Sequence, residues 1–371
     1  MKRELTARPF MITKAQGWIE MMKKAVLCLI AALLTAALLL SCSSGGDLTL
    51  TTGDPPSSFS EPSSGSSDLP VIAPTDPLES SKTPSPSPIP LPSDPPTPSG
   101  SWTPVVDPVF RTEQAFIYDV EMGCFRFIGG EERIIYPAST TKLLTILYAL
   151  TLLEDPQQRI TPGNELELVK PHSSIAYIKS HHVLTVEQLI EGMLLPSGND
   201  AAYVLAAAAG RVLDPGAKDG KAAVDAFVEG MNVYAARLGM KGSHFINPDG
   251  YDDEDHYSTL EDMAIVAIHA YSCPLIRKYC NVEKDDVVYA SGHKMTWQNT
   301  NLNLWKGTQY YSPYVNGLKT GSVNSEYYCL LSSAEIEGKV FLFGFFAEPN
   351  PDARFLDTLT AIAWVKKYAM D

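Results

Sequence analysis

Two kinds of hydrophobic pattern divide the second half of the chain. Gln114–Asp119 and Cys124–Ile128 have the composition of two strands joined by a glycine turn. Strand-like runs return near the end, at Tyr314–Gly321, Tyr327–Ser333 and Lys339–Ala347. Between these two groups, apolar residues recur at helical spacing. We therefore predict one sheet built from both ends of a domain, with helices in the middle.

The expected helices are marked by their spacing and by their first and last residues. After Pro137, apolar residues at helical spacing predict a buried helix with Ser139 at its start. Thr185 and Gln188 form a capping box for a helix that Pro196 closes. Further helices are expected at Asp200–Ala209, at Thr259–Tyr271 behind a capping box of Ser258 and Glu261, and at Ala353–Met370.

The region 43–108 has the composition of a linker rather than of a domain. It consists mainly of Ser, Pro, Thr, Gly and Asp, and it holds sixteen of the chain's 28 prolines. Such a segment buries too little apolar surface to offset its ordering entropy. We therefore predict an export signal at 1–41, a disordered, partly polyproline II tether at 42–108, and one folded domain at 109–371 with a helical lobe at about 155–275.

The N-terminal part has the pattern of a bacterial export signal. Ala25–Leu40 is an unbroken run of sixteen apolar and small residues directly after Lys23 and Lys24. It is short for a membrane-spanning helix, which needs about 20 residues. The run ends in Leu-Leu-Ser-Cys42, which resembles a lipobox, where the cysteine is acylated and becomes the new N-terminus.

We expect a lipid on Cys42 to hold the protein at the outer face of the cytoplasmic membrane. An uncleaved signal anchor with an incidental cysteine is the alternative. Met21 or Met22 begins a more ordinary signal than Met1 does, so the first twenty residues fit an over-extended start.

Charge and cysteine content exclude several classes of function. The formal net charge is -14, and no Lys/Arg cluster appears in the folded part, which argues against nucleic-acid binding. Neither the cysteines nor the seven histidines show metal-ligand spacing, so no metal site is expected, and the motifs described below imply no organic cofactor. A disulfide between Cys273 and Cys280 and a pair of buried thiols both fit an exported domain.

Three short motifs follow one another in the folded part: Ser139-Thr-Thr-Lys142, Ser197-Gly-Asn199 and Lys319-Thr-Gly321. Each alone is weak, and S-x-x-K occurs a second time as Ser291-Gly-His-Lys294. Only the first copy opens a helix with its lysine one turn later, which places hydroxyl and amine on one face. We therefore expect Ser139 to be the nucleophile.

These motifs resemble those of the penicillin-binding D-alanyl-D-alanine carboxypeptidases of low molecular mass, which share a fold with serine β-lactamases. The resemblance covers nearly all of 109–371. It rests on Tyr136–Lys142, Pro196–Ala202, Val315–Gly321, Phe245–Gly250 and His256–Thr259. The family usually has Asp where Asn316 stands, and residues 322–326 differ from its pattern. It implies a three-layer transpeptidase-like α/β domain, with an antiparallel sheet between helices and an all-α lobe.

The residue types suit acyl transfer through an activated serine. A serine hydroxyl needs a base at neutral pH, and a lysine desolvated in a dry site can be neutral enough to take its proton. Lys142 fits that role, while the backbone N–H of Ser139 at a helix start can hold an oxyanion. The resemblance implies Ser322 N–H as the second donor, and Gly321 keeps the strand open to the substrate backbone.

The resemblance also assigns the other site residues. Ser197 would relay a proton to the leaving amine, Asn199 would hold the substrate amide, and Lys319 with Thr320 would receive the terminal carboxylate. The implied function is removal of the C-terminal D-alanine from peptidoglycan stem peptides, with covalent binding of β-lactams. A class A-like β-lactamase is one alternative, although no convincing Glu-x-x-Leu-Asn run lies between the second and third motifs. A penicillin-binding sensor that never turns over is another.

Four further polar residues receive ordinary structural readings. We expect His256 to make a structural contact near a helix cap and not to act as a base. Arg354 has two readings: contact with a substrate carboxylate, which the resemblance implies for an arginine near this point, and the start of the last helix on a solvated face, which we favour. We expect His181 and His182 to face solvent before a helix.

Overall fold

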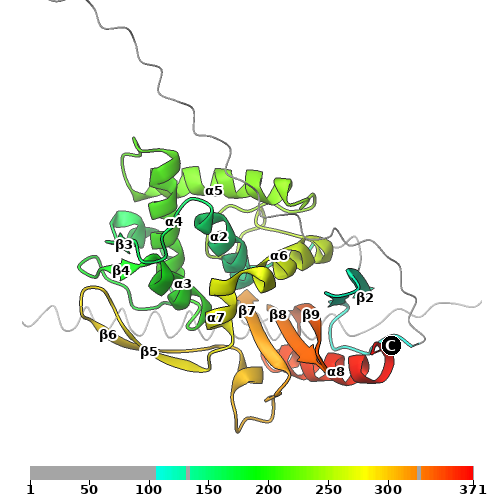
Figure 1. Ribbon diagram of the computed structural model, residues 1–371. Helices are drawn as coiled ribbons and strands as arrows, with labels where there is room; N and C mark the ends of the chain where they lie inside the picture. Colours follow the sequence, from blue (N-terminus) through cyan, green and yellow to red (C-terminus); the bar gives the residue numbers. More distant parts are fainter. Residues whose placement is uncertain (1–105, 131–133, 324–326, 371) are drawn as a thin grey trace, which may run out of the picture. The chain divides into compact units, whose positions relative to one another are not determined.

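The two ends of the folded region meet in a single antiparallel sheet (Figure 1). The computed structural model describes residues 106–130, 134–323 and 327–370, so the expected export signal, Cys42 and almost all of the tether lie outside them. The sheet consists of β1 (Gln114–Asp119), β2 (Cys124–Gly129), β7 (Val315–Val323), β8 (Tyr327–Ile336) and β9 (Lys339–Glu348). The strand order is β2-β1-β9-β8-β7, which leaves β7 at one edge.

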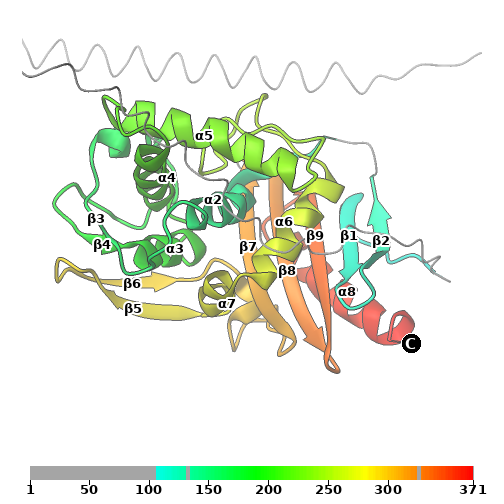
Figure 2. The same ribbon diagram turned by 45° about the horizontal axis from the view of Figure 1, so that its top comes forward.

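Helices cover both faces of this sheet (Figure 2). Along β9, Phe341, Phe343 and Phe345 point to the face covered by α8 (Ala353–Tyr368). The opposite face packs against α6 (Leu260–Ser272), as the alternation of side chains along a strand requires. This arrangement confirms the predicted three-layer α/β domain.

A close contact in the sheet requires Gly344. This residue lies opposite Phe116 in the register of β1 and β9, and a Cβ added to it would come within 2.1 Å of the Phe116 ring. The absence of a side chain at Gly344 therefore leaves room for the aromatic ring of the neighbouring strand.

The helical part lies beside the edge strand β7 (Figure 1). It contains α2 (Thr141–Leu150), α3 (Val186–Leu194), α4 (Asn199–Leu213), α5 (Gly220–Arg237) and the short α7 (Pro274–Cys280). Two small strand pairs accompany these helices: β3 (Arg159–Ile160) with β4 (Leu184–Thr185), and β5 (Lys284–Val288) with β6 (Lys294–Gln298). Among the described helices, none combines the length and the hydropathy needed to cross a bilayer.

The two predicted capping boxes had different outcomes. Thr185 accepts from the backbone N–H of Gln188, whose side chain returns to the backbone of Thr185, so the first box is present at the start of α3. At α6 the prediction was wrong by one residue, because Thr259 and not Ser258 accepts from the backbone of Asp262. The Ser258 hydroxyl instead bonds that of Ser243 at 2.7 Å.

The structure also tests the expectations for His182 and for the cysteine pair. His182 is buried, with its ring 4.4 Å from that of His293 and 5.1 Å from that of Tyr289, so it does not face solvent. Cys273 and Cys280 are both free thiols, as are the other described cysteines.

Candidate active site

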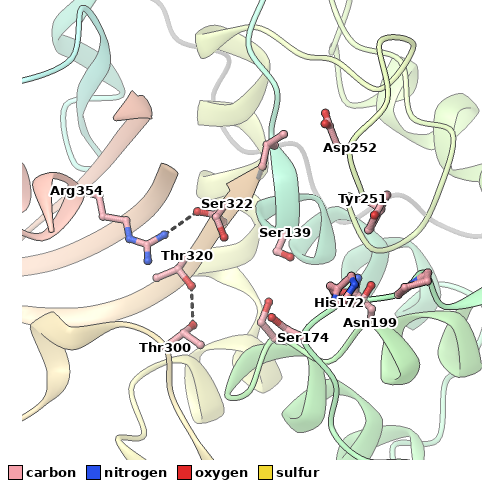
Figure 3. A pocket seen from close by; sticks show the side chains of 16 residues that line it. Ser139, His172, Ser174, Asn199, Tyr251, Asp252, Thr300, Thr320, Ser322 and Arg354 are labelled. Carbon is pink, nitrogen blue, oxygen red and sulfur yellow. Dashed lines mark hydrogen bonds between the residues drawn. The ribbon is translucent and has the colours of Figure 1, made fainter. Parts of the chain in front are cut away.

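A cavity of about 380 Å³ opens where α2, α4 and the edge strand β7 meet (Figure 3). Ser139 lies near its middle, with Arg354 on one side and Tyr251 on the other. Its walls come from seven separate stretches of chain: Ser139, Pro171–Ser174, Ser197 with Asn199, Gly250–Asp252, Thr300, Thr320–Val323 and Arg354. The three motifs found in the sequence therefore converge on one place.

The first motif forms the turn that leads into α2. A 3-10 helix at Ala138–Thr140 continues into α2, which places Lys142 one turn after Ser139. The Nζ of Lys142 lies 2.8 Å from the Oγ of Ser139 and 2.7 Å from the Oδ1 of Asn199. A third neighbour, the backbone carbonyl oxygen of Asp249, is also 2.7 Å from Nζ.

Burial makes Lys142 an unusual lysine. Its side chain is fully buried, and this desolvation lowers the pKa of its amine to about 8. The nearby carboxylates of Asp249 and Asp200 act in the opposite direction and limit the shift. A substantial fraction of Lys142 is therefore neutral near physiological pH, as a proton acceptor must be.

A tight turn that packs against the residues next to Ser139 positions the backbone carbonyl of Asp249 beside Lys142. The side chain of Asn247 accepts from the backbone N–H of Gly250 at 2.7 Å, which closes the turn. Gly250 has φ +78, and a Cβ there would lie 1.8 Å from the carbonyl oxygen of Ala138. Only glycine fits this conformation and this contact. The motif Phe245–Gly250 was noticed in the sequence, but its contact with Lys142 was not.

The second motif enters the cavity from the start of α4. Ser197 has φ +61, a conformation that is uncommon for a residue with a side chain. Both Ser197 and Asn199 are buried in the wall of the cavity. Asn199 is the first residue of α4, so the helix fixes the position of the amide that contacts Lys142.

The third motif lies on β7, where the strand passes the turn of Ser139. A Cβ on Gly321 would lie 2.5 Å from the Sγ of Cys329 and 3.0 Å from the Cβ of Ala138, so a larger residue would push the strand away. Thr320 lines the cavity with its hydroxyl 2.6 Å from that of Thr300, and Ser322 follows on the same wall (Figure 3).

Lys319 is placed differently from its two neighbours. It is buried behind the wall, and its Nζ donates to the carbonyl oxygen of Thr320 at 2.9 Å. Burial holds the pKa of Lys319 well below its usual range, and the charges of Lys142 and Arg354 act in the same direction.

Arg354 does not start the last helix on a solvated face, so that expectation was wrong. It is half-buried, it lines the cavity, and its guanidinium donates to the carbonyl oxygen of Gly321 at 2.6 Å. The rings of Tyr328 and Phe355 lie 5.4 and 4.9 Å from its guanidinium carbon. The cavity therefore has a cationic end beside the third motif.

The remaining candidates lie away from the chemistry. His256 is buried against α2 with its Nε2 2.9 Å from the Oγ1 of Thr141, which confirms the structural reading. Ser291 and Lys294, the second S-x-x-K pair, are exposed in and after the turn between β5 and β6. Within the described residues, no group of His, Cys, Asp and Glu is arranged to hold a metal ion.

Comparison with known proteins identifies the family. Residues 105–342 match the family model described as D-alanyl-D-alanine carboxypeptidase, which is more than half of the chain. The chain belongs to this family. The match includes all three motifs and ends within β9.

Individual relatives agree with this assignment. The chain is 29% identical over 229 residues to the D-alanyl-D-alanine carboxypeptidase DacF of Bacillus subtilis, a match that covers 61% of this chain and 54% of that protein. It is 31% identical over 226 residues to the D-alanyl-D-alanine carboxypeptidase of Streptomyces sp. strain K15, covering 59% and 75% of the two chains. The chain thus spans about half the length of the Bacillus subtilis relative.

A solved structure agrees with the fold. The crystal structure of the Streptomyces K15 DD-transpeptidase superimposes with a TM-score of 0.64 at 27% identity, and the match covers 71% of this chain and 100% of the other.

Proposed function

We propose that this protein is a serine D-alanyl-D-alanine carboxypeptidase that removes the C-terminal D-alanine from peptidoglycan stem peptides. The observation that carries the proposal is the environment of the Lys142 amine. Two of its three neighbours, the Oδ1 of Asn199 and the carbonyl oxygen of Asp249, can only accept hydrogen bonds. A neutral amine has two hydrogens for these two acceptors, so its lone pair is left to face the Ser139 hydroxyl.

The first chemical step follows from this geometry. The Ser139 hydroxyl gives its proton to Lys142 as its Oγ attacks the carbonyl carbon between the last two residues of the peptide. The negative charge that develops on the carbonyl oxygen is held by the backbone N–H groups of Ser139 and Ser322, both in the cavity wall. Asn199 holds the substrate amide and keeps Lys142 in place.

Collapse of the tetrahedral intermediate breaks the carbon–nitrogen bond and leaves an ester on Ser139. The departing D-alanine nitrogen takes a proton, which Ser197 relays from Lys142. Water then attacks the ester and gives a proton to Lys142, which passes it to the departing Oγ of Ser139, so that the shortened peptide leaves and the serine and the neutral lysine are restored.

The cationic end of the cavity fits the free carboxylate of the substrate. Arg354 and the hydroxyl of Thr320 lie beside Ser322, on the side of Ser139 away from Tyr251 (Figure 3). Lys319 supports Thr320 from behind through its backbone carbonyl. A β-lactam presents a carboxylate and a strained amide in a similar arrangement, so we propose that penicillins acylate Ser139 too.

The decisive experiment incubates residues 106–371 with a stem pentapeptide and identifies the products by mass spectrometry. We expect a tetrapeptide and free D-alanine. A folded protein that is acylated by penicillin but leaves the pentapeptide intact would be a penicillin-binding sensor. A protein that clears penicillin catalytically and ignores the peptide would be a β-lactamase. Either result would overturn the proposal.

We further propose that the enzyme is exported and held by a lipid on Cys42 at the outer face of the cytoplasmic membrane. The support is the apolar run Ala25–Leu40, which follows two lysines and ends directly before Ser41 and Cys42. Metabolic labelling with a fatty-acid analogue tests this: Cys42→Ala should lose the label. Label that remains on the variant would place the lipid elsewhere, and wild-type protein without label would contradict the anchor.

A further inference from the structure

One wall of the cavity is a segment without regular secondary structure. Pro171–Ser174 line the cavity, and the chain continues through Ser174–Ile178 without forming a helix or a strand. Tyr177 within this segment has φ +61. The conformation of the wall therefore depends on hydrogen bonds from other parts of the chain.

Asp200 provides two of these bonds, both to residues just after the wall. Its Oδ1 accepts from the backbone N–H of Ala176 at 2.7 Å, and its Oδ2 accepts from that of Ile178 at 2.8 Å. The Oδ1 also accepts from Ala201 in the first turn of α4 at 2.9 Å. The carboxylate is buried, so these bonds are shielded from water.

The same helix start bonds the segment a second time. The backbone N–H of Asn199 donates to the carbonyl oxygen of Ser174 at 2.8 Å. Asn199 is also the residue whose side chain accepts from Lys142. The wall of the cavity and the amide beside the proposed base are therefore joined through two adjacent residues, Asn199 and Asp200.

The hairpin of β5 and β6 supports the segment from its other side. The hydroxyl of Tyr289 and the indole N–H of Trp297 both donate to the carbonyl oxygen of Ala176, each at 3.2 Å. A Cβ added to Gly198 would lie 2.8 Å from the Cβ of Ala176, so the segment is packed tightly against the second motif. Asp200 and the residues of this hairpin are not among those to which we assign a catalytic role.

We propose that Asp200 is a positioning residue, which fixes the segment directly after the cavity-wall residues Pro171–Ser174 and, through its chain neighbour Asn199, the amine of Lys142. The inference rests on the proposed function, because its effect is read in acylation of Ser139. A buried carboxylate that accepts three backbone N–H groups holds two segments in one arrangement. Replacing it by an amide turns one acceptor into a donor that faces backbone N–H groups.

The chain offers a matched control for Asp200→Asn. Asp262 is also a buried aspartate in the first turn of a helix, α6, and it accepts from the backbone N–H groups of Lys241 and Gly242 at 3.2 and 2.8 Å. None of these residues lines the cavity. Asp262 also accepts from the hydroxyl of Ser243 at 2.6 Å, so Asp262→Asn disturbs a comparable set of three bonds outside the cavity.

Both variants are compared with the wild type by kcat and KM for a stem pentapeptide and by the rate constant of acylation with saturating penicillin. Measurements are made on the alkaline plateau of each pH profile, where Lys142 is neutral. On this plateau, a change in the pKa of Lys142 caused by the lost charge of Asp200 does not affect the rates that are compared. We expect Asp200→Asn to lower kcat and the acylation rate roughly tenfold to hundredfold, the size of effect that small misplacements cause. Asp262→Asn should lower the melting temperature but leave both rates near those of the wild type.

Equal rates for Asp200→Asn and the wild type would overturn the inference while the proposed function stands. An inactive wild type would instead remove the proposed function. If Asp200→Asn does not fold, amide hydrogen exchange of the wild type decides: the N–H groups of Ala176 and Ile178 should exchange slowly. Fast exchange at both would show that Asp200 does not hold this segment.

Discussion

The Nζ of Lys142 lies 2.8 Å from the Oγ of Ser139, in a pocket where its two other neighbours only accept hydrogen bonds. Because burial lowers the pKa of Lys142 to about 8, its neutral form increases as the pH rises through that value. We expect kcat/KM for a stem pentapeptide to increase with pH, with a midpoint near 8, and then to level off. A pH–rate profile tests this, and a rate that stays flat from neutral to alkaline pH would remove Lys142 as the base.

Two serines begin an S-x-x-K motif, Ser139 and Ser291. Replacing each of them in turn shows whether the motif alone or its place in the cavity makes a serine reactive. Ser139→Ala should abolish covalent labelling by a fluorescent penicillin, because no other hydroxyl lies beside Lys142 at 2.8 Å in the described residues. Ser291→Ala removes an exposed serine from the turn after β5 and should label at the wild-type rate. Mass spectrometry of the labelled peptide should identify Ser139, and label on Ser291 would contradict the nucleophile assignment.

The centre of the site could be predicted from sequence because its parts are local. Ser139 and Lys142 are one helical turn apart, and Ser197 and Asn199 flank a helix start, so each pair is positioned by its own backbone. The strands β8 and β9 were predictable because each is a continuous run, mostly of apolar residues, that is buried on both faces over most of its length.

Part of what escaped prediction depends on long-range packing. Asp249 contacts Lys142 through its main-chain carbonyl, a group that every residue carries and that no side-chain pattern reveals. The contact of Arg354 with the cavity was considered from the sequence but not favoured, because it depends on α8 packing against β8 and β9, which brings Arg354 within hydrogen-bond reach of Gly321 on β7. The hairpin of β5 and β6 was missed because charged residues such as Lys284 and Asp286 occupy its strands, and few positions, such as Val287 and Trp297, are buried.

Arg354 provides a test of how the substrate carboxylate is held. Arg354→Ala should lower kcat/KM for a pentapeptide about tenfold to hundredfold, since a lost hydrogen bond to a charged group costs about 1.5–3 kcal/mol. A peptide whose C-terminus is amidated should lose much less. Arg277→Ala is the control, because Arg277 is an exposed arginine on α7 that does not line this cavity. An equal loss for both peptides would contradict carboxylate binding.

His256 is expected to matter for stability and not for the chemistry. Its Nδ1 accepts from the backbone N–H of Ile246 at 3.3 Å, so Nε2 carries the proton that reaches Thr141. Burial lowers the pKa of His256 to about 3. The pKa of a histidine in the unfolded chain is about 6.5. Below this pH the unfolded chain binds a proton that the folded protein does not, so the free energy of unfolding falls by up to about 1.4 kcal/mol for each pH unit of acidification.

His256→Gln should remove this acid sensitivity. In urea unfolding at neutral and mildly acidic pH, the free energy of unfolding of the variant should fall less steeply than that of the wild type. The acylation rate of the folded variant should stay close to that of the wild type. A folded variant that no longer reacts with penicillin would give His256 a catalytic role.

If residues 42–108 form a tether, we expect its deletion to shorten the distance that the enzyme can reach from the membrane without changing its catalytic rate. As a flexible coil, about 66 residues would span roughly 45 Å, whereas a polyproline II segment of the same length would approach about 200 Å. The described domain already has a contact at its first residue, because the indole N–H of Trp364 donates to the carbonyl oxygen of Val106 at 2.8 Å. A deletion of residues 43–104 spares this bond, so it should leave turnover of a soluble pentapeptide unchanged.

Processing of intact cell wall should nevertheless fall in cells that carry this deletion, because the anchored enzyme could no longer reach material above the membrane. A Gly/Ser linker of matched reach should restore it, since only length and not sequence is required. Muropeptide analysis measures the wall, and hydrolysis of a soluble pentapeptide by the purified protein measures the enzyme. If the deletion also reduced hydrolysis of the soluble peptide, residues before 105 would have to contact the catalytic domain, and a simple tether would be contradicted.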